Sequence, residues 1–163
     1  MRIPDARDGG GRSGWTIFAI ILSVSAVLAY IYFRQVGSPY LTERLELHDQ
    51  ILRGTAESPY RYRVLVPFVA EALTRALGAA LPGNRVFLLA YAICDLAAIF
   101  FLLGVLYRYL RAWFSNEQAL IGMLFAAATM PMALRDHYFQ PWSILEAGLF
   151  AAGLLCVRDK RYR

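Results

Sequence analysis

Long runs of apolar residues with few or no charges constrain this 163-residue chain more than any other feature. Trp15–Phe33 contains no charged residue, and at a rise of about 1.5 Å per residue a helix of this length nearly crosses the hydrocarbon of a bilayer. Similar runs follow at 86–107, 119–134 and 142–157. Because none of them alternates between apolar and polar residues, we expect helices rather than strands. The sequence therefore predicts an all-α integral membrane protein with about four transmembrane helices.

Composition indicates the same class. Apolar residues make up 58% of the chain, whereas a soluble domain has about 45–50% including glycine. The net charge is +5; in a membrane protein such an excess orients the helices more often than it binds nucleic acid, so no nucleic-acid partner is expected.

Cys94 and Cys156 both lie in apolar runs, which argues against a disulfide. No Cys or His cluster has metal-ligand spacing, so no cofactor is expected, although the sequence leaves a divalent cation open.

The first apolar run has a second interpretation, as a signal peptide. The small residues Ser23–Ala26 resemble a cleavage site. The apolar core of a signal peptide should end there after about 7–15 residues, but this run continues through Ile31. We therefore expect an uncleaved membrane anchor.

The polar interval 34–85 is predicted to be an outer loop that carries two interfacial amphipathic helices. The first should begin at Ser38–Pro39, an N-cap followed by a proline, and should end at Gly54. The second should occupy 67–81, opened by its proline, with Val66 extended before it. About fifteen helical residues reach only about 22 Å, which is too short to cross the bilayer.

Basic residues predict which parts of the chain face the cytoplasm. Two arginines lie in the connection between the second and third apolar runs, and the chain ends in the basic tail 158–163. The positive-inside rule places both of these in the cytoplasm, together with the flexible arm 1–14, and leaves the 34–85 loop outside. Residues 15–157 then form a single helical membrane domain.

All basic residues except Lys160 are arginines, a bias typical of GC-rich bacterial genomes, so we expect the bacterial inner membrane.

Two acids interrupt the apolar runs. Asp95 lies near the middle of its run, and Glu146 lies about one turn after Trp142. A carboxylate at membrane depth is costly and usually faces protein or water. Asp95 is therefore either a proton, ion or substrate contact or a partner in a helix–helix hydrogen bond. Glu146 either contributes to function or reaches toward water at the headgroups.

The stretch Ser58–Pro67 interleaves aromatic and basic residues. In an extended segment Arg61 and Arg63 point one way, and Tyr60 and Tyr62 point the other. Arginine forks match phosphate, and aromatic rings suit a membrane interface or a sugar face, so these four are candidate substrate-binding residues. The alternative is that the arginines only anchor the chain to lipid headgroups.

The acids of the first interfacial helix are the candidates for a general base. Glu46 and Asp49 are three residues apart and so share a face of a helix, although an ordinary solvated face is the alternative. His48 and His137 are isolated in the sequence, and a catalytic role is not favoured for either. The chain contains no P-loop, dinucleotide-binding or Gly-x-Ser-x-Gly motif.

The segment Tyr60–Pro67 resembles a stretch found in bacterial multi-span proteins related to the C-type membrane glycosyltransferases. The layout is similar as well, since that fold begins with one span, continues with an outer loop holding two interfacial helices, and then has closely spaced spans. The resemblance implies a polyprenyl-phosphate lipid as sugar donor and an acid of the outer loop as base, here Asp49 or Glu46. The family usually has an acid soon after the first span and has many more spans. We therefore expect the N-terminal part of such a fold, as a fragment or a truncated relative.

Three functions of different classes follow. The first is a membrane glycosyltransferase, or the N-terminal part of one. The second is a non-enzymatic subunit or scaffold that packs against a partner membrane subunit through two small-residue surfaces, which consist of Ala90, Ala97 and Ala98 and of Ala147, Gly148, Ala151 and Ala152. A transporter is the third: Asp95 fits it, but four spans without a visible repeat do not.

Overall fold

The computed structural model describes residues 10–60, 63–78, 83–133 and 142–158. Every regular element in these ranges is a helix, which confirms the predicted all-α class. In chain order the elements are α1 (Gly10–Tyr32), the π-helical turn η1 (Phe33–Gly37), α2 (Leu41–Leu52), α3 (Leu65–Leu77), α4 (Asn84–Leu110), α5 (Asn116–Ala133) and α6 (Ser143–Arg158).

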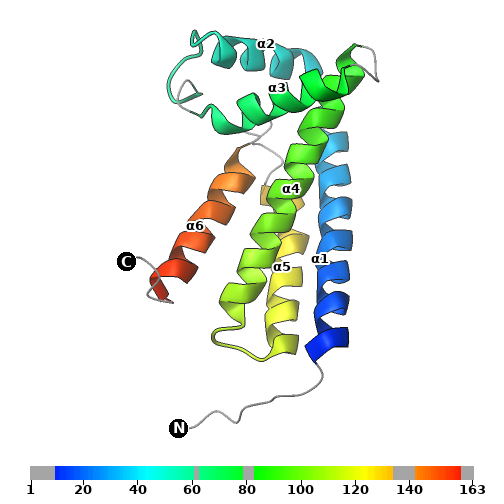
Figure 1. The fold of residues 1–163 in the computed structure, drawn as a ribbon, viewed down its shortest axis with the longest axis vertical. Helices are drawn as coiled ribbons and strands as arrows, with labels where there is room; N and C mark the ends of the chain where they lie inside the picture. Colours follow the sequence, from blue (N-terminus) through cyan, green and yellow to red (C-terminus); the bar gives the residue numbers. More distant parts are fainter. Residues whose placement is uncertain (1–9, 61–62, 79–82, 134–141, 159–163) are drawn as a thin grey trace.

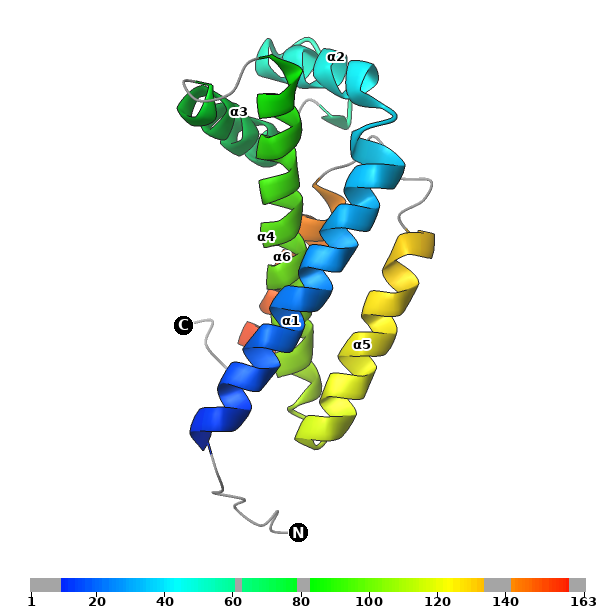
Figure 2. The same cartoon turned by 90° about the vertical axis from the view of Figure 1, so that its right-hand side faces the viewer.

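Four helices run along one axis and two lie across their end. Helices α1, α4, α5 and α6 form the bundle, and α2 and α3 cross its end near the beginning of α4 (Figures 1 and 2). Helix α4 is central, because it packs against α1, α3, α5 and α6. The arrangement of one long helix, two crossing helices and three further helices is the order that the sequence predicts.

Two of the helices are long enough and apolar enough to cross a bilayer. These are Gly14–Gly37, with a mean hydropathy of 2.2, and Asn84–Leu110, with 2.5. Helices α5 and α6 are shorter, with 18 and 16 residues, and α5 begins with the polar residues Asn116–Gln118. The described residues therefore give two candidate spans where the sequence predicts four.

The first crossing helix begins later than predicted. Phe33–Gly37 continues α1 as a π-helical turn, in which the Ser38 N–H donates to the Phe33 carbonyl at 2.9 Å. Ser38 and Pro39 are therefore part of a turn and not the helix start, and α2 begins at Leu41. The predicted stop is confirmed, since Gly54 has φ +70°, a conformation that is inexpensive only for glycine.

The second crossing helix begins earlier than predicted. Helix α3 starts at Leu65, so Val66 is helical, and the prediction that Val66 is extended is wrong. Pro67 is still in the first turn, where its missing N–H has no partner to lose, and the Phe68 N–H closes that turn on the Val64 carbonyl at 2.9 Å. The helix ends at Leu77, and the remainder of the predicted 67–81 segment lies largely outside the described residues.

Small residues of α4 and α6 are used for packing inside the chain. Gly148 of α6 is buried, and a Cβ atom there would come within 2.7 Å of Phe101 Cδ1 and 3.5 Å of Leu102 Cα. Gly148 therefore packs on α4 of this chain, whereas the sequence assigned its surface to a partner subunit. Ala90 and Ala98 of α4 are also buried, so much of the small-residue surface assigned to a partner faces this chain's own helices.

Replacing Gly148 with Leu should lower the melting temperature in detergent, because the larger side chain pushes α6 away from Phe101. Overpacking of this kind costs about 1–3 kcal/mol. Gly153→Leu is the matched control, since nothing lies within 4 Å of a Cβ atom at Gly153 of the same helix. Equal melting temperatures for the two variants would show that the α4–α6 contact does not depend on Gly148.

Candidate functional site

A cluster of polar side chains is buried where α2 and α3 meet α4. We call the set Arg44, His48, Glu71, Tyr91 and Asp95 the junction cluster. Arg44 and His48 are four residues apart on α2, and Tyr91 and Asp95 are four apart on α4, so each pair occupies one helical face. Around them lies an apolar core to which all three helices contribute, including Ile51, Val66, Ala70 and Phe87. The helical period therefore brings polar groups from two segments into one apolar setting.

His48 connects the two crossing helices to the bundle. Its ring is 7% exposed, with Nδ1 2.9 Å from Tyr91 Oη and Nε2 3.3 Å from Glu71 Oε2. A neutral imidazole satisfies both contacts in one way: Tyr91 donates its hydroxyl hydrogen to Nδ1, and Nε2–H donates to the Glu71 carboxylate. Phe87 packs edge-on against the ring at 5.2 Å between centroids. The result is a fixed chain of phenol, imidazole and carboxylate, an arrangement suited to moving a proton.

Glu71 is the member of the junction cluster that reaches solvent. Its side chain is 26% exposed and accepts a hydrogen bond from Arg75 Nε at 2.7 Å. This bond from Arg75 lowers the pKa of Glu71; partial burial opposes that shift, and the bond to His48 adds to it. Glu71 is therefore an ionised carboxylate at neutral pH that is held by the Arg75 cation on one side and by the His48 ring N–H on the other.

Arg44 is a buried cation with unused donors. It is 5% exposed, its guanidinium carbon lies 4.5 Å from the centre of the Tyr91 ring, and its Nε and Nη2 have no hydrogen-bond partner among the described residues. A Cβ atom on Gly37 would come within 3.2 Å of Nη1, so the glycine of η1 makes room for the guanidinium. A cation–π contact offsets only part of the cost of burying a charge.

Asp95 of α4 is also buried. It is 3% exposed, and Oδ1 has no hydrogen-bond partner among the described residues. Arg44 is close enough to act electrostatically on this carboxylate, although no described ion pair joins them. The burial confirms that Asp95 does not face the outside of the bundle. Polar atoms without partners in an apolar core require an explanation, and a functional role is one.

The acids predicted as bases lie away from this cluster. Asp49 is exposed and pairs with Arg53 at 2.9 Å, and Glu46 is exposed and accepts a hydrogen bond from Gln50 at 3.3 Å. Glu46 also borders an open surface groove of about 320 Å³, to which Tyr60 contributes. The assignment of Asp49 and Glu46 as catalytic residues stays a prediction, and the structure gives neither of them a buried or unusual environment.

The tyrosine–arginine stretch contacts the start of α6. Tyr60 packs on Trp142 at 5.8 Å between ring centres, and the Arg63 guanidinium lies 5.7 Å from the same ring. Arg63 Nε is also 3.6 Å from Glu146 Oε1, so Glu146 balances the charge of this arginine. Arg61 and Tyr62 lie outside the described residues, and substrate binding by the stretch stays a prediction.

Sequence reasoning missed Arg44, His48, Glu71 and Tyr91 as a group. The available signal was the spacing, because Arg44 and His48 occur on the same face of α2 as Leu41, Leu45 and Ile51. A cation and an imidazole on an apolar helical face indicate a buried polar contact. The partners of His48 come from segments 23 and 43 residues away, which periodicity within one helix does not reveal.

No protein-family model, curated protein or solved structure matches the chain. Among the described residues no three His, Cys, Asp or Glu side chains gather in a way that could hold a metal ion. A functional proposal therefore depends on the architecture and the junction cluster.

Glu71→Gln should destabilise the protein most at neutral pH. The pKa of folded Glu71 lies below its ordinary value of 4.5, so its ionised form contributes stability that is fully present above about pH 4.5 and is lost as the pH falls through the lowered value. The difference in melting temperature between the parent and the variant should shrink on acidification below that point. Glu43→Gln, at an exposed acid of α2, is the control and should change little at any pH. A difference that is constant with pH would show that the ionised carboxylate contributes nothing.

Proposed function

We propose that the chain is an integral membrane protein in which α1, α4, α5 and α6 cross the bilayer and α2 and α3 lie at its outer surface. Only 28% and 44% of the two candidate spans are buried, whereas the core helix of a soluble protein is mostly buried. Soluble proteins rarely expose contiguous apolar surface on this scale. The large apolar side chains exposed on the four helices include Phe18, Leu22, Val27, Leu89, Ile93, Ile121, Phe125, Leu149, Phe150 and Leu154.

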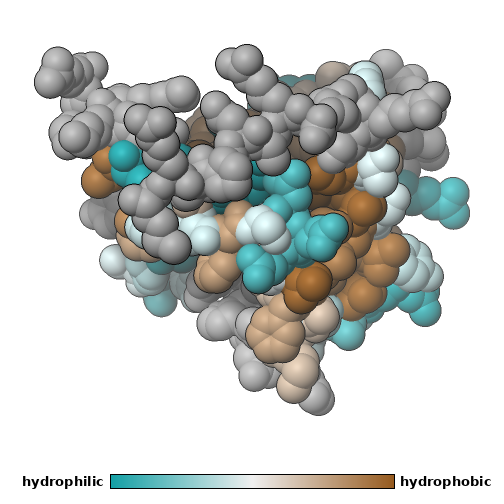
Figure 3. Space-filling view, turned by 90° about the horizontal axis from the view of Figure 1, so that it is seen from below, coloured by the Kyte–Doolittle hydropathy of each residue, from teal (hydrophilic) through white to brown (hydrophobic). Residues whose placement is uncertain are grey.

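The proposed orientation has the α4–α5 connection in the cytoplasm of a bacterial cell, at the inner membrane. The beginning of α1 and this connection lie at the same end of the bundle, opposite α2 and α3 (Figure 1). Arg108 and Arg111 lie at that end, which fits the positive-inside rule. Viewed from this end, hydrophilic side chains lie beside apolar ones that reach the surface (Figure 3).

The activity that the residues support best is glycosyl transfer from a polyprenyl-phosphate-linked sugar. The resemblance of Tyr60–Pro67 implies that an acid of the first outer loop is the base, and Glu71 is an acid of this loop. The junction cluster is the observation that carries the proposal, because it combines an ionised, oriented carboxylate with a buried arginine that has unused donors. In this proposal Glu71 takes the place of Asp49 and Glu46.

The proposed reaction assigns one role to each group. The acceptor hydroxyl passes its proton to the Glu71 carboxylate, whose oxygens each keep a second lone pair beside the bonds to Arg75 and His48. The acceptor oxygen forms a bond to the anomeric carbon, and the bond from that carbon to the phosphate oxygen breaks. Its electron pair leaves on the lipid phosphate, and Arg44 stabilises the negative charge that develops there.

A non-enzymatic membrane subunit is the second candidate. It is supported by the apolar face of α5, where Ile121 is 67% and Phe125 is 72% exposed. A partner helix could cover this face, whereas Gly148 and Ala90 are already used inside the chain. The buried polar atoms of the junction cluster have no role in this alternative, so it explains less of the structure.

Glu71→Gln should lower the release of polyprenyl phosphate from a polyprenyl-phosphate hexose by about 10²–10⁴-fold, the usual contribution of a general base. The assay measures the parent protein and its variants in liposomes. Arg44→Gln should also lose most of its turnover. Asp49→Asn is the matched control, since this carboxylate is exposed and paired only with Arg53. A parent protein without turnover would contradict the proposed function. Turnover lost in Asp49→Asn but kept in Glu71→Gln would contradict the choice of base.

A further inference from the structure

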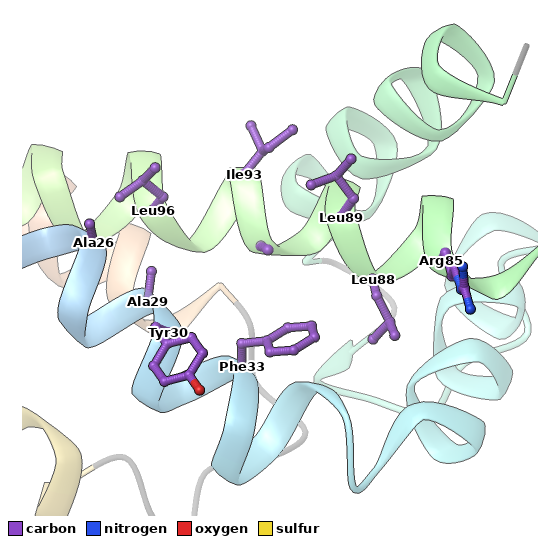
Figure 4. A pocket seen from close by; sticks show the side chains of 10 residues that line it. Ala26, Ala29, Tyr30, Phe33, Arg85, Leu88, Leu89, Ile93 and Leu96 are labelled. Carbon is purple, nitrogen blue, oxygen red and sulfur yellow. The ribbon is translucent and has the colours of Figure 1, made fainter. Parts of the chain in front are cut away.

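An apolar groove runs between α1 and α4 on the outside of the bundle, with a volume of about 490 Å³. Small residues of both helices, Ala26, Ala29 and Ala92, line it together with larger apolar side chains. Tyr30 and Arg85 are the only lining residues with polar side-chain atoms. In Figure 4 the labelled side chains of α1 and α4 border the groove, and Arg85 lies at one end of it.

The groove extends from the level of the crossing helices into the proposed bilayer. Its α4 lining runs from Arg85 to Leu96, about 16 Å at the helical rise. Arg85 belongs to the first turn of α4, at the end of the bundle where α2 and α3 lie, and Leu96 lies nearer the middle of the helix. A charge is therefore placed at the proposed outer surface, and the apolar remainder is placed at the depth of lipid chains.

Among the described residues, no acid forms an ion pair with Arg85. It is exposed, and none of the ion pairs among the described residues includes it, whereas Arg53, Arg63 and Arg75 each pair with an acid. The start of α4 adds a partial positive charge of its own. An arginine in this setting favours an anion, and its planar fork matches phosphate oxygens.

We propose that this groove holds a hydrocarbon chain of an anionic phospholipid whose phosphate binds Arg85. Charge complementarity and shape together identify the occupant, because such a lipid has one charge at one end of a long apolar chain. The proposal rests on the membrane location but is independent of the proposed enzymatic activity.

A second groove gives an internal comparison. It lies on another side of α1, against α5, with a volume of about 430 Å³, and Val24, Leu124 and Ala128 are among its lining residues. It contains no charged residue, and Ser23 carries its only polar side chain. If the phosphate contact with Arg85 decides occupancy, anionic lipid should prefer the α1–α4 groove over this one of similar size.

The test is native mass spectrometry of the full chain released from membranes of phosphatidylglycerol and phosphatidylcholine in equal amounts. The parent protein should retain phosphatidylglycerol preferentially. Arg85→Gln should lose this preference, and Ala26→Phe, which fills the groove, should lose the bound lipid itself. The matched controls are Arg34→Gln, an exposed arginine of η1 outside the groove lining, and Ala128→Phe in the other groove. Both should behave like the parent, and circular dichroism should show that all four variants are folded.

Three outcomes would overturn the proposal. Equal retention of both lipids by the parent would show no anion selectivity, and an equal loss in Arg34→Gln and Arg85→Gln would show diffuse surface attraction. Displacement of phosphatidylglycerol by equimolar added polyprenyl phosphate would identify a site for the sugar-carrier lipid instead. The experiment separates this proposal from the enzymatic one, because Arg85→Gln should keep glycosyl transfer and Glu71→Gln should keep the bound phospholipid.

Discussion

The two hydrogen bonds of His48 hold the crossing helices to the bundle. One side of the ring contacts Tyr91 of α4 and the other contacts Glu71 of α3, while its own backbone belongs to α2. Three consecutive helices therefore meet at one imidazole. The surrounding apolar side chains would pack with or without these bonds, but they do not by themselves fix how α2 and α3 lie across α4. Directional bonds in a dry setting supply that specificity.

The same setting makes the buried charges costly. Arg44 and Asp95 are both nearly inaccessible, and each leaves at least one polar atom without a partner among the described residues. An apolar replacement of matched shape is often at least as stable as a buried charge pair. The arrangement is therefore better explained by a functional role than by stability, and in the proposed function the partly exposed Glu71 is where a substrate would enter.

Much of the architecture could be predicted from the sequence, because long apolar runs and the proline and glycine signals act locally. Trp15–Phe33 and 86–107 lie within α1 and α4 and their extensions, and Gly54 ends α2 as expected. Ser38 is not the predicted N-cap, because a π-helical turn prolongs α1 past it. Val66 is not extended as predicted, because the proline that follows it is tolerated at the third position of α3. The site was harder to predict: His48 is isolated in sequence, and its partners are assembled only by the fold.

The central claim is that His48 is fixed as the Nε2–H tautomer between Tyr91 and Glu71. The chain has two histidines, so in His137→Gln a ¹⁵N-histidine spectrum of the protein in detergent reports on His48 alone. At neutral pH the account predicts a single Nε2–H tautomer in the parent and mixed tautomers after Tyr91→Phe or Glu71→Gln. A parent spectrum with the mixed tautomers of a solvated imidazole, unchanged by either substitution, would contradict it.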